Sequence, residues 1–324
     1  MSLYRAPPWL PGGHLQTIYP AVFLCDRPPA LRRERWDTPD GDFIDLDFAD
    51  AGGSAPAALD APRVVLFHGL EGSSASHYAV ALMSALGCAG WNGVVVHFRG
   101  CSGEPNRLPR AYHSGDAAEI AWILERLAKL GQPLFAAGVS LGGNALLKWL
   151  GEAGDGAAGL ILAAAAVSAP LDLMASGDAL GRGFNRVYTR RFLATMRAAS
   201  LAKLERFPGI FDRRRMLAAR NLRQFDDVVT APLHGFRDRD DYWTRASSKP
   251  GLAAVRLPTL VLNARNDPFL PAQYLPRPDQ VSEPVQLEQP EEGGHVGFAS
   301  GPFPGNLGWL PQRIISFFRE HTSS

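Results

Sequence analysis

The sequence predicts an α/β fold built on a mostly parallel, doubly wound sheet of about eight strands, with an N-terminal antiparallel hairpin and an inserted helical cap. Three observations lead to this prediction. Continuous apolar runs alternate with helical stretches from about residue 60 onward, which is typical of β-α-β units. Alternating polar and apolar residues precede them, and one long segment without a buried strand interrupts them. With 324 residues, the chain is long enough for one large domain with an insertion.

The expected elements follow in order along the chain. Around Pro39-Asp-Gly41, residues 35–38 and 42–48 alternate polar and apolar side chains, which predicts the hairpin. Residues 52–62 are rich in Gly, Ala and Pro and predict a connector. Apolar runs predict buried strands over 63–67, 94–98, 134–139, 160–167 and 259–263, and residues 285–288 are expected to form the last strand. Helices are expected over 77–87, 114–130 and 140–152, the second with Asp116 as its candidate cap.

The long interruption predicts a separate unit. About ninety residues lie between the strand ending near Ala169 and the one beginning at Thr259. Insertions of this length commonly form lids over a binding site. We therefore expect an α/β core over residues 1–169 and 251–324, with an N-terminal arm over 1–34, and a helical cap over 170–250.

The cap is rich in basic residues. From Arg182 to Arg223 the sequence holds eleven arginines and Lys203 but only two acids, Glu205 and Asp212. Solvated helix faces are one explanation of this excess. The other is an electropositive cap that attracts an anionic substrate or a lipid surface. Acidic residues between 226 and 241 follow closely and are expected to neutralise part of the excess.

Composition excludes several classes of function. The net charge of +1 gives no overall attraction to nucleic acid, so we expect no nucleic-acid partner. The N-terminus lacks the uninterrupted apolar region of a signal peptide, and the most apolar run, 159–168, is too short to span a bilayer. The three cysteines, Cys25, Cys88 and Cys101, are widely spaced and suit reduced thiols better than a disulfide framework. We therefore predict a cytoplasmic protein.

No cofactor and no metal site are predicted. Metal-ligand spacing is missing from the candidate histidines His68, His77, His97 and His113. The glycines around residue 140 do not form the Gly-x-x-x-x-Gly-Lys-Ser/Thr loop that binds phosphates. Cys101, at the carboxyl end of a strand, is an alternative thiol nucleophile, although the sequence indicates no base to activate it.

The strongest chemical signal is a serine between a strand and a helix. The apolar strand 134–139 runs into Gly138-Val-Ser140-Leu-Gly142 and then directly into a helical run. So tight a turn strains the backbone at Ser140 and leaves room only for glycine at Gly138 and Gly142. The turn lifts the hydroxyl towards the helix N-terminus, where backbone N–H groups can stabilise an oxyanion. Ser140 is therefore the candidate nucleophile.

A serine hydroxyl needs a base, and the base needs an orienting carboxylate. His295 lies in the Gly-rich loop 291–298, after the last predicted strand, and is the candidate base. Asp267 follows the strand 259–263 at short range and is the candidate acid. The alternatives are an incidental loop histidine and an Asp-Pro turn.

The oxyanion donors are expected from two loops. Gly69 follows the strand 63–67 and permits close backbone approach to a reacting carbonyl. We assign the donors as the backbone N–H groups of Leu70 and Leu141. His68 beside this loop is an alternative second base, but hydrogen bonding that shapes the loop accounts for it better.

Together these features resemble the α/β-hydrolase superfamily, in which the triad follows the chain order Ser, acid, His. They resemble more closely its YheT-like branch of bacterial hydrolases and eukaryotic lipid esterases. The resemblance rests on residues 12–20, 66–72, 97–107, 112–116, 138–144 and 266–269. It implies serine hydrolysis of carboxylic esters by Ser140, Asp267 and His295, on short- to medium-chain acyl esters that include monoacylglycerols or phospholipids. For residues 12–20 the only role we infer is packing of the N-terminal arm beside the site.

Two other functions remain open from the sequence. An acyltransferase would use the same acyl-enzyme with an acceptor other than water, and a dry, deep pocket would favour it. A non-catalytic interaction module on the same fold is the alternative from another class, because a fold does not imply a function. The presence of all three triad residues argues against that module.

Overall fold

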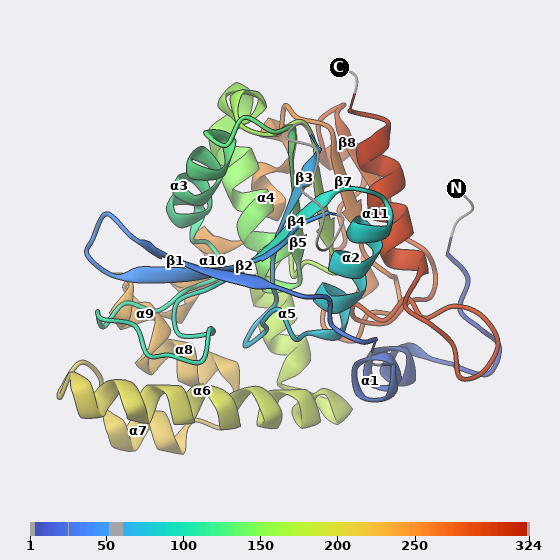
Figure 1. Ribbon diagram of the computed structural model, residues 1–324. Coiled ribbons are helices and arrows are strands. Elements are labelled where there is room, and N and C mark those ends of the chain that lie inside the picture. Colours follow the sequence, from blue (N-terminus) through green and yellow to red (C-terminus); the bar gives the residue numbers. More distant parts are fainter. Residues whose placement is uncertain (1–3, 25, 52–60, 323–324) are drawn as a thin grey trace.

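The computed structural model describes residues 4–24, 26–51 and 61–322, and its described strands form one eight-stranded sheet (Figure 1). Cys25 and most of the expected connector lie outside these residues. The strand order is β1-β2-β4-β3-β5-β6-β7-β8. In chain order the strands are β1 (Arg32–Asp37), β2 (Phe43–Ala49), β3 (Arg63–Phe67), β4 (Asn92–His97), β5 (Leu134–Val139), β6 (Ala164–Val167), β7 (Thr259–Leu262) and β8 (Val285–Glu288).

The pairing confirms the predicted fold class. β1 and β2 form the antiparallel hairpin, β2 also pairs antiparallel with β4, and every later pair in the order is parallel. The strand expected over 160–167 is shorter than predicted, since its ladder with β5 begins at Ala164. Before it lies the 3-10 helix η1 (Gly154–Gly159), and the apolar residues 160–163, of which Ile161 and Ala163 are buried, connect this helix to β6.

Helices cover both faces of the sheet. One core cluster joins the sheet to α3 (Ala117–Ala128) and α4 (Leu141–Ala153), and the other joins it to α2 (His77–Cys88) and α11 (Trp309–Arg319). Figure 1 shows these pairs on opposite sides of the strands. Both faces are thus shielded from water, which explains why the central parallel strands β5 and β6 contain no polar side chain. α1 (Gly13–Phe23) lies outside both pairs.

The expected cap of α3 is corrected by the structure. Asp116 occupies the N-cap position, but its carboxylate makes no capping hydrogen bond. It accepts instead from Arg110 at 2.6 Å, because the guanidinium offers a charged donor where the helix offers a neutral N–H.

Between β6 and β7 the described chain is helical and includes no strand. Its helices are α5 (Leu173–Leu180), η2 (Gly183–Asn185), α6 (Arg186–Arg206), α7 (Arg213–Ala218), α8 (Leu222–Val228), α9 (Thr230–Leu233), α10 (Arg239–Ala246) and η3 (Lys249–Ala254). They pack around apolar clusters of their own, one of which contains Leu193, Met216 and Phe225. After β7 the short helices η4 (Ala272–Tyr274) and η5 (Pro278–Gln280) precede β8.

Candidate active site

Ser140 lies in a strained turn between β5 and α4. Its backbone has φ 52° and ψ −120°, in the left-handed half of the map that residues other than glycine avoid at a cost of about 1–3 kcal/mol. A Cβ at Gly138 would lie 2.6 Å from the carbonyl oxygen of Gly142, and a Cβ at Gly142 would overlap that of Phe67. Both positions therefore require glycine, because the helix start packs directly on the neighbouring strands.

The three candidate triad residues form a continuous chain of hydrogen bonds. His295 Nε2 lies 2.9 Å from Ser140 Oγ, and His295 Nδ1 lies 2.9 Å from Asp267 Oδ2. Asp267 is buried, and its other oxygen accepts from the backbone N–H of Phe269 at 2.7 Å. With Nδ1–H donated to the carboxylate, Nε2 is free to accept the serine proton. The fold thus brings His295 next to Ser140, which lies 155 positions earlier in the chain, and next to Asp267, which lies 28 positions earlier.

The expected oxyanion donors flank Ser140. Leu70 and Leu141 line the same cavity as Ser140, and Leu141 is the first residue of α4, where a backbone N–H has no intrahelical partner. Among the described residues no hydrogen-bond acceptor is found for the Leu70 N–H. The preceding N–H, that of Gly69, donates to the Tyr78 hydroxyl at 2.8 Å and fixes the turn.

His68 holds this loop from beneath. Its Nε2 accepts from the backbone N–H of Phe98 at 3.1 Å, so its Nδ1 carries the proton and donates to the Gly69 carbonyl at 2.7 Å. Burial lowers the pKa of His68 to about 3, which keeps the ring neutral. His68 therefore shapes the loop, and it has no free nitrogen with which to act as a second base.

An apolar cavity of about 440 Å³ opens at Ser140 beneath the inserted helices, a volume within the usual range for ligand pockets. Its apolar lining includes Leu173, Leu180, Phe192, Met196 and Phe225. Cys101 also lines it, but burial raises the pKa of this thiol to about 12. A neutral thiol is a poor nucleophile, so the structure disfavours the alternative in which Cys101 attacks.

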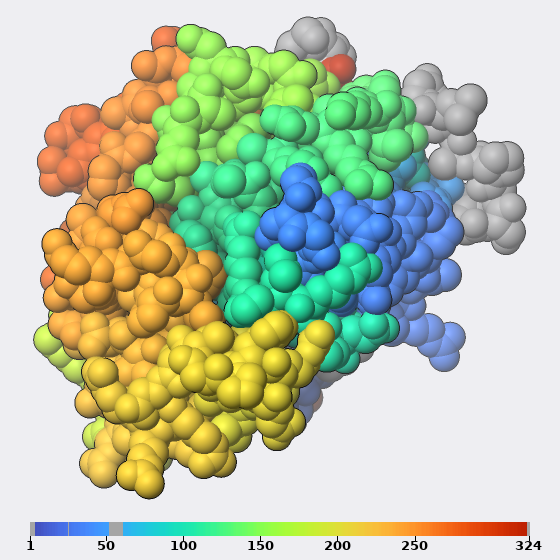
Figure 2. Space-filling view, turned by 90° about the vertical axis from the view of Figure 1, so that its left-hand side faces the viewer, coloured from blue at the N-terminus to red at the C-terminus, as the bar shows by residue number. Residues whose placement is uncertain are grey.

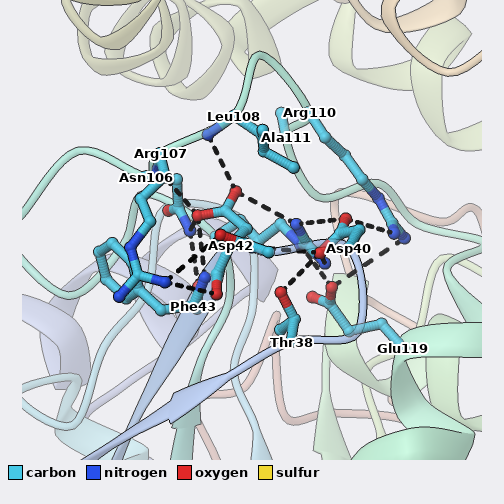
Figure 3. A network of polar contacts seen from close by, with 12 residues as sticks. Thr38, Asp40, Asp42, Phe43, Asn106, Arg107, Leu108, Arg110, Ala111 and Glu119 are labelled. Atoms are coloured by element: carbon cyan, nitrogen blue, oxygen red, sulfur yellow. Dashed lines mark hydrogen bonds and ion pairs between the residues drawn. The ribbon is translucent and has the colours of Figure 1, made fainter.

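Residues 99–113 form one wall of the cavity and rest on a buried polar network (Figure 3). Asp42, in the hairpin, accepts from Asn106 Nδ2 at 2.9 Å and from the backbone N–H of Arg107 at 2.8 Å. The Arg99 guanidinium is buried beside it and forms ion pairs with Asp40, Asp42 and Glu119. The hairpin therefore fixes a wall of the cavity through charged hydrogen bonds.

The inserted helix α6 attaches to the same wall. Lys203 Nζ donates to the backbone carbonyl of Arg110 at 3.1 Å, and Arg206 donates to that of Asn106. Figure 2 shows the yellow segment around residue 200 lying against the teal segment around residue 100. The insertion and the 99–113 wall thus enclose the cavity together.

The basic excess of the insertion is only partly paired. Arg223 lies 2.7 Å from Asp178 and 3.4 Å from Asp240, and Arg215 lies 3.8 Å from Asp227. No carboxylate of the described residues forms an ion pair with the exposed arginines Arg186, Arg190, Arg191, Arg213, Arg214 and Arg220.

Asp226 departs from the expected neutralising role. Its side chain is buried and accepts from Thr230 Oγ1 at 2.6 Å and from Trp243 Nε1 at 2.8 Å, so it faces the interior of the insertion. Burial raises the pKa of Asp226 to about 6 because both of its partners are uncharged donors.

Other expectations concern metals, thiols and membranes. Within residues 4–24, 26–51 and 61–322 no group of three or more His, Cys, Asp or Glu side chains is arranged to hold a metal ion. Cys88 and Cys101 are free thiols. In the same described residues, every helix is too short or too polar to cross a membrane.

Comparison with known proteins identifies the family. Residues 62–302 match the model of the α/β hydrolase fold. The chain belongs to the α/β-hydrolase fold family. Within it, the chain is 41% identical to the candidate esterase YheT of Escherichia coli (strain K12), over 93% of this chain and 88% of that protein. It is 31% identical to the human phospholipase ABHD3, over 97% of this chain and 78% of that protein. These relatives confirm the YheT-like branch.

The fold of this α/β hydrolase also matches solved structures. The structure of Est1E from Butyrivibrio proteoclasticus with bound ferulic acid superposes with a TM-score of 0.57 at 15% identity, covering 90% of this chain and all of that one. At so low an identity the likeness concerns the fold alone.

Sequence reasoning missed several residues of the site in this α/β hydrolase. Phe269 stacks on His295, and Tyr78 holds the Gly69 turn. Gln16 and Thr17 contact the loop of His295, whereas the sequence of residues 12–20 indicates only packing beside the site. The position of Phe269 next to Asp267-Pro268 was the only available signal for its proximity.

Proposed function

We propose that this α/β hydrolase cleaves carboxylic esters through an acyl-enzyme intermediate on Ser140. That it is an ester hydrolase follows from its family and from relatives named as esterase and phospholipase. The observation that carries the serine mechanism is the unbroken series of hydrogen bonds from Ser140 through His295 to Asp267.

The geometry suits each proton transfer of this reaction. Ser140 Oγ attacks the ester carbonyl carbon while His295 Nε2 takes the hydroxyl proton, and Asp267 stabilises the imidazolium. The backbone N–H groups of Leu70 and Leu141 receive the oxyanion of the tetrahedral intermediate. As the C–O bond breaks, His295 returns the proton to the leaving alcohol. A water molecule then attacks the acyl-enzyme, His295 takes its proton, and the free acid is released.

The cavity supports apolar acyl groups as the substrate class. Its lining is mainly apolar, which favours short- to medium-chain acyl esters. Monoacylglycerols and phospholipids are the lipid candidates, and the human relative is named as a phospholipase. A panel of p-nitrophenyl esters from acetate to laurate, run beside a monoacylglycerol and a phospholipid, tests this assignment. A steep preference for acetate would exclude the lipid candidates.

The nucleophile is tested by covalent labelling. A fluorophosphonate probe should label the parent protein at Ser140, and Ser140→Ala should lose both labelling and ester turnover. Cys101→Ala, in the same cavity, is the matched control and should keep both. Undiminished labelling of Ser140→Ala would show that another residue is the nucleophile.

Acyl transfer is the second candidate, favoured by the apolar lining, which limits water around the acyl-enzyme. Turnover of one ester is compared with and without glycerol and longer alcohols. New ester formed at the expense of free acid supports transfer, whereas an unchanged yield of acid supports hydrolysis.

We also propose that the cap, residues 170–250, covers the site and contacts anionic lipid. Near its start, Phe184 and Val187 are exposed beside Arg186, Arg190 and Arg191, a combination that suits a negatively charged membrane surface. Binding to phosphatidylglycerol vesicles should exceed binding to phosphatidylcholine vesicles and should fall at high salt.

A charge-matched pair of variants locates this contact. Replacing Arg186, Arg190 and Arg191 together by Gln should weaken vesicle binding more than replacing Arg213, Arg214 and Arg220. The first set adjoins two exposed apolar side chains, Phe184 and Val187, at 52% and 48% exposure, whereas the second adjoins Leu217 at 38%. An equal loss of vesicle binding in the two triple variants would contradict this location of the contact. Vesicle binding that does not change with salt concentration would contradict it as well.

A further inference from the structure

The N-terminal helix α1 packs directly on the two loops that carry Asp267 and His295. Figure 1 shows α1 beside the chain between β8 and α11. A Cβ added to Gly13 would overlap the carbonyl oxygen of Asn266, the residue before Asp267, and a Cβ at Gly297 would overlap that of Gln16. The backbones therefore meet with no side chain between them, and α1 contacts both loops at once.

Hydrogen bonds fix the loop of His295 at four successive backbone N–H groups, each held by a side-chain oxygen. The donors and acceptors are Gly293 to Gln16 Oε1 at 2.9 Å, Gly294 to Asn266 Oδ1 at 3.0 Å, His295 to Thr17 Oγ1 at 2.8 Å and Val296 to Ser168 Oγ at 3.0 Å. Two of the four acceptors come from α1. At these residues the loop forms a turn but no helix or strand, so the side-chain contacts satisfy N–H groups that no regular ladder pairs.

Gln16 uses its whole hydrogen-bonding capacity in this contact. Its Oε1 accepts from Gly293 N–H and from Asn266 Nδ2 at 2.8 Å. Its Nε2 donates to the Leu10 carbonyl at 2.9 Å and to Glu292 Oε1 at 3.3 Å. A buried amide with two donors and two acceptors filled has one orientation only. It therefore links the acid loop to the base loop rigidly.

The buried face of α1 is polar. Its buried residues are Gln16, Thr17 and Pro20, whereas Leu15, Val22 and Phe23 are exposed. A helix that served only to cover the core would bury its apolar side chains instead. The Thr17 hydroxyl is itself oriented, because it donates to the Gly13 carbonyl at 2.6 Å while it accepts from His295 N–H.

We propose that Gln16 and Thr17 are positioning residues for the catalytic base. They hold the backbone of His295 at a fixed distance from the Asp267 loop, so that the imidazole stays within hydrogen-bond reach of both Ser140 and Asp267. This inference rests on the proposed function, because Gln16 and Thr17 can position the catalytic base only if His295 is that base. It also gives residues 12–20 a chemical role beyond packing.

The test compares Thr17→Val with Thr17→Ser. Valine keeps the shape of threonine but cannot accept from His295 N–H, whereas serine can. We expect Thr17→Val to lower kcat by about 10- to 100-fold with KM for a short ester almost unchanged, because misplacement of a catalytic group slows the chemical step. Thr17→Ser should restore most of the parent kcat. Gln16→Leu should act like Thr17→Val, and Leu15→Ala, on the exposed face of α1, is the matched control.

A spectroscopic measurement separates positioning from simple loss of structure. The far-downfield proton signal of a His–Asp pair should be present in the parent and in Thr17→Ser and broadened or lost in Thr17→Val. Thr17→Val with parent-like kcat and signal would overturn the inference, as would a loss of activity that only follows the fraction unfolded. If Ser140→Ala also keeps activity, the proposed function itself has failed, which distinguishes the two results.

Discussion

The Phe269 ring stacks on the His295 imidazole, with ring centroids 3.9 Å apart and planes inclined by 22°. The backbone N–H of Phe269 also donates to Asp267 Oδ1. One residue therefore orients the candidate acid through its backbone and the candidate base through its ring. The same ring lines the cavity, so it lies between the candidate triad and the cavity.

Phe269→Ala should lower kcat for p-nitrophenyl acetate by about tenfold, because the imidazole loses the ring that stacks on it. Phe192→Ala is the matched control, since Phe192 lines the same cavity but contacts Phe269 and not His295. This control should change KM for longer esters and leave acetate turnover near the parent value. Steady-state kinetics on acetate and octanoate esters distinguish the two variants, and identical effects of both would contradict a specific role for the stack.

Gly142→Ala should destabilise the protein by about 3 kcal/mol or more, because its Cβ would overlap the Phe67 carbonyl in a backbone that cannot move away. Gly87→Ala is the contrasting variant. It lies in α2 with nothing within 4 Å of the added Cβ, and it should stabilise by about 0.5–1 kcal/mol through higher helix propensity. Urea unfolding measures both free energies, and equal signs for the two would be inconsistent with this packing argument.

Asp226 predicts a specific dependence of stability on pH. Its pKa is raised to about 6 in the folded protein by burial, from an ordinary value of 3.8, so the folded state binds the proton more tightly than the unfolded state. Its effect on stability is therefore most favourable below pH 3.8 and becomes unfavourable as the pH rises to about 6. Asp226→Asn keeps the size of the side chain without the titration, and its amide can accept from Trp243 Nε1 through Oδ1 while its Nδ2 donates to the Thr230 hydroxyl. Relative to the parent, this variant should gain stability on the order of 2 kcal/mol between pH 4 and pH 7.

Chemical unfolding of the parent and of Asp226→Asn at a series of pH values gives this difference directly. Other carboxyl groups titrate in the same range, but they cancel in the difference between the two proteins. A difference that stays constant from pH 4 to pH 7 would show that Asp226 titrates normally in the folded state.

The ion pairs of the hairpin should differ sharply in strength. Asp42 is fully buried and accepts from Arg99, Asn106 and the 99–113 wall, so Asp42→Asn should cost about 3 kcal/mol and lower ester turnover as the wall loosens. Asp37 pairs with Arg107 at the exposed edge, and Asp37→Asn should cost less than about 1 kcal/mol. Thermal unfolding and the turnover of one ester are measured for both variants, Asp42→Asn and Asp37→Asn. Comparable losses would mean that burial does not set the strength of these pairs.

Much of the fold and of the candidate site could be predicted from short stretches of sequence. The parallel strands are apolar runs such as 63–67 and 134–139, and local chemistry alone marks them. Ser140 was recognisable because the turn needs Gly138 and Gly142 within two residues of it. Asp267 and His295 followed from their places after predicted strands, and the structure brings both within hydrogen-bond reach of one another.

The parts that could not be predicted depend on contacts between distant segments. Asp226 looks like a surface acid in sequence, and only the packing of Trp243 and Thr230 buries it. Asp116 occupies a position where a helix cap is expected, yet its carboxylate accepts a hydrogen bond from Arg110 instead. The local sequence pattern indicates which interactions a residue can form, whereas the tertiary structure determines which partners it contacts.

By itself the sequence determined the order of strands and helices, the strained serine turn and the three residues of the candidate triad, because each depends on neighbours a few positions away. The tertiary structure decided what holds that triad in place. Gln16 and Gly293 are 277 positions apart, and the Phe269 ring meets His295 only after the sheet has aligned their loops. No local pattern encodes such pairings, since they arise from the packing of a helix and two loops at the edge of a completed sheet.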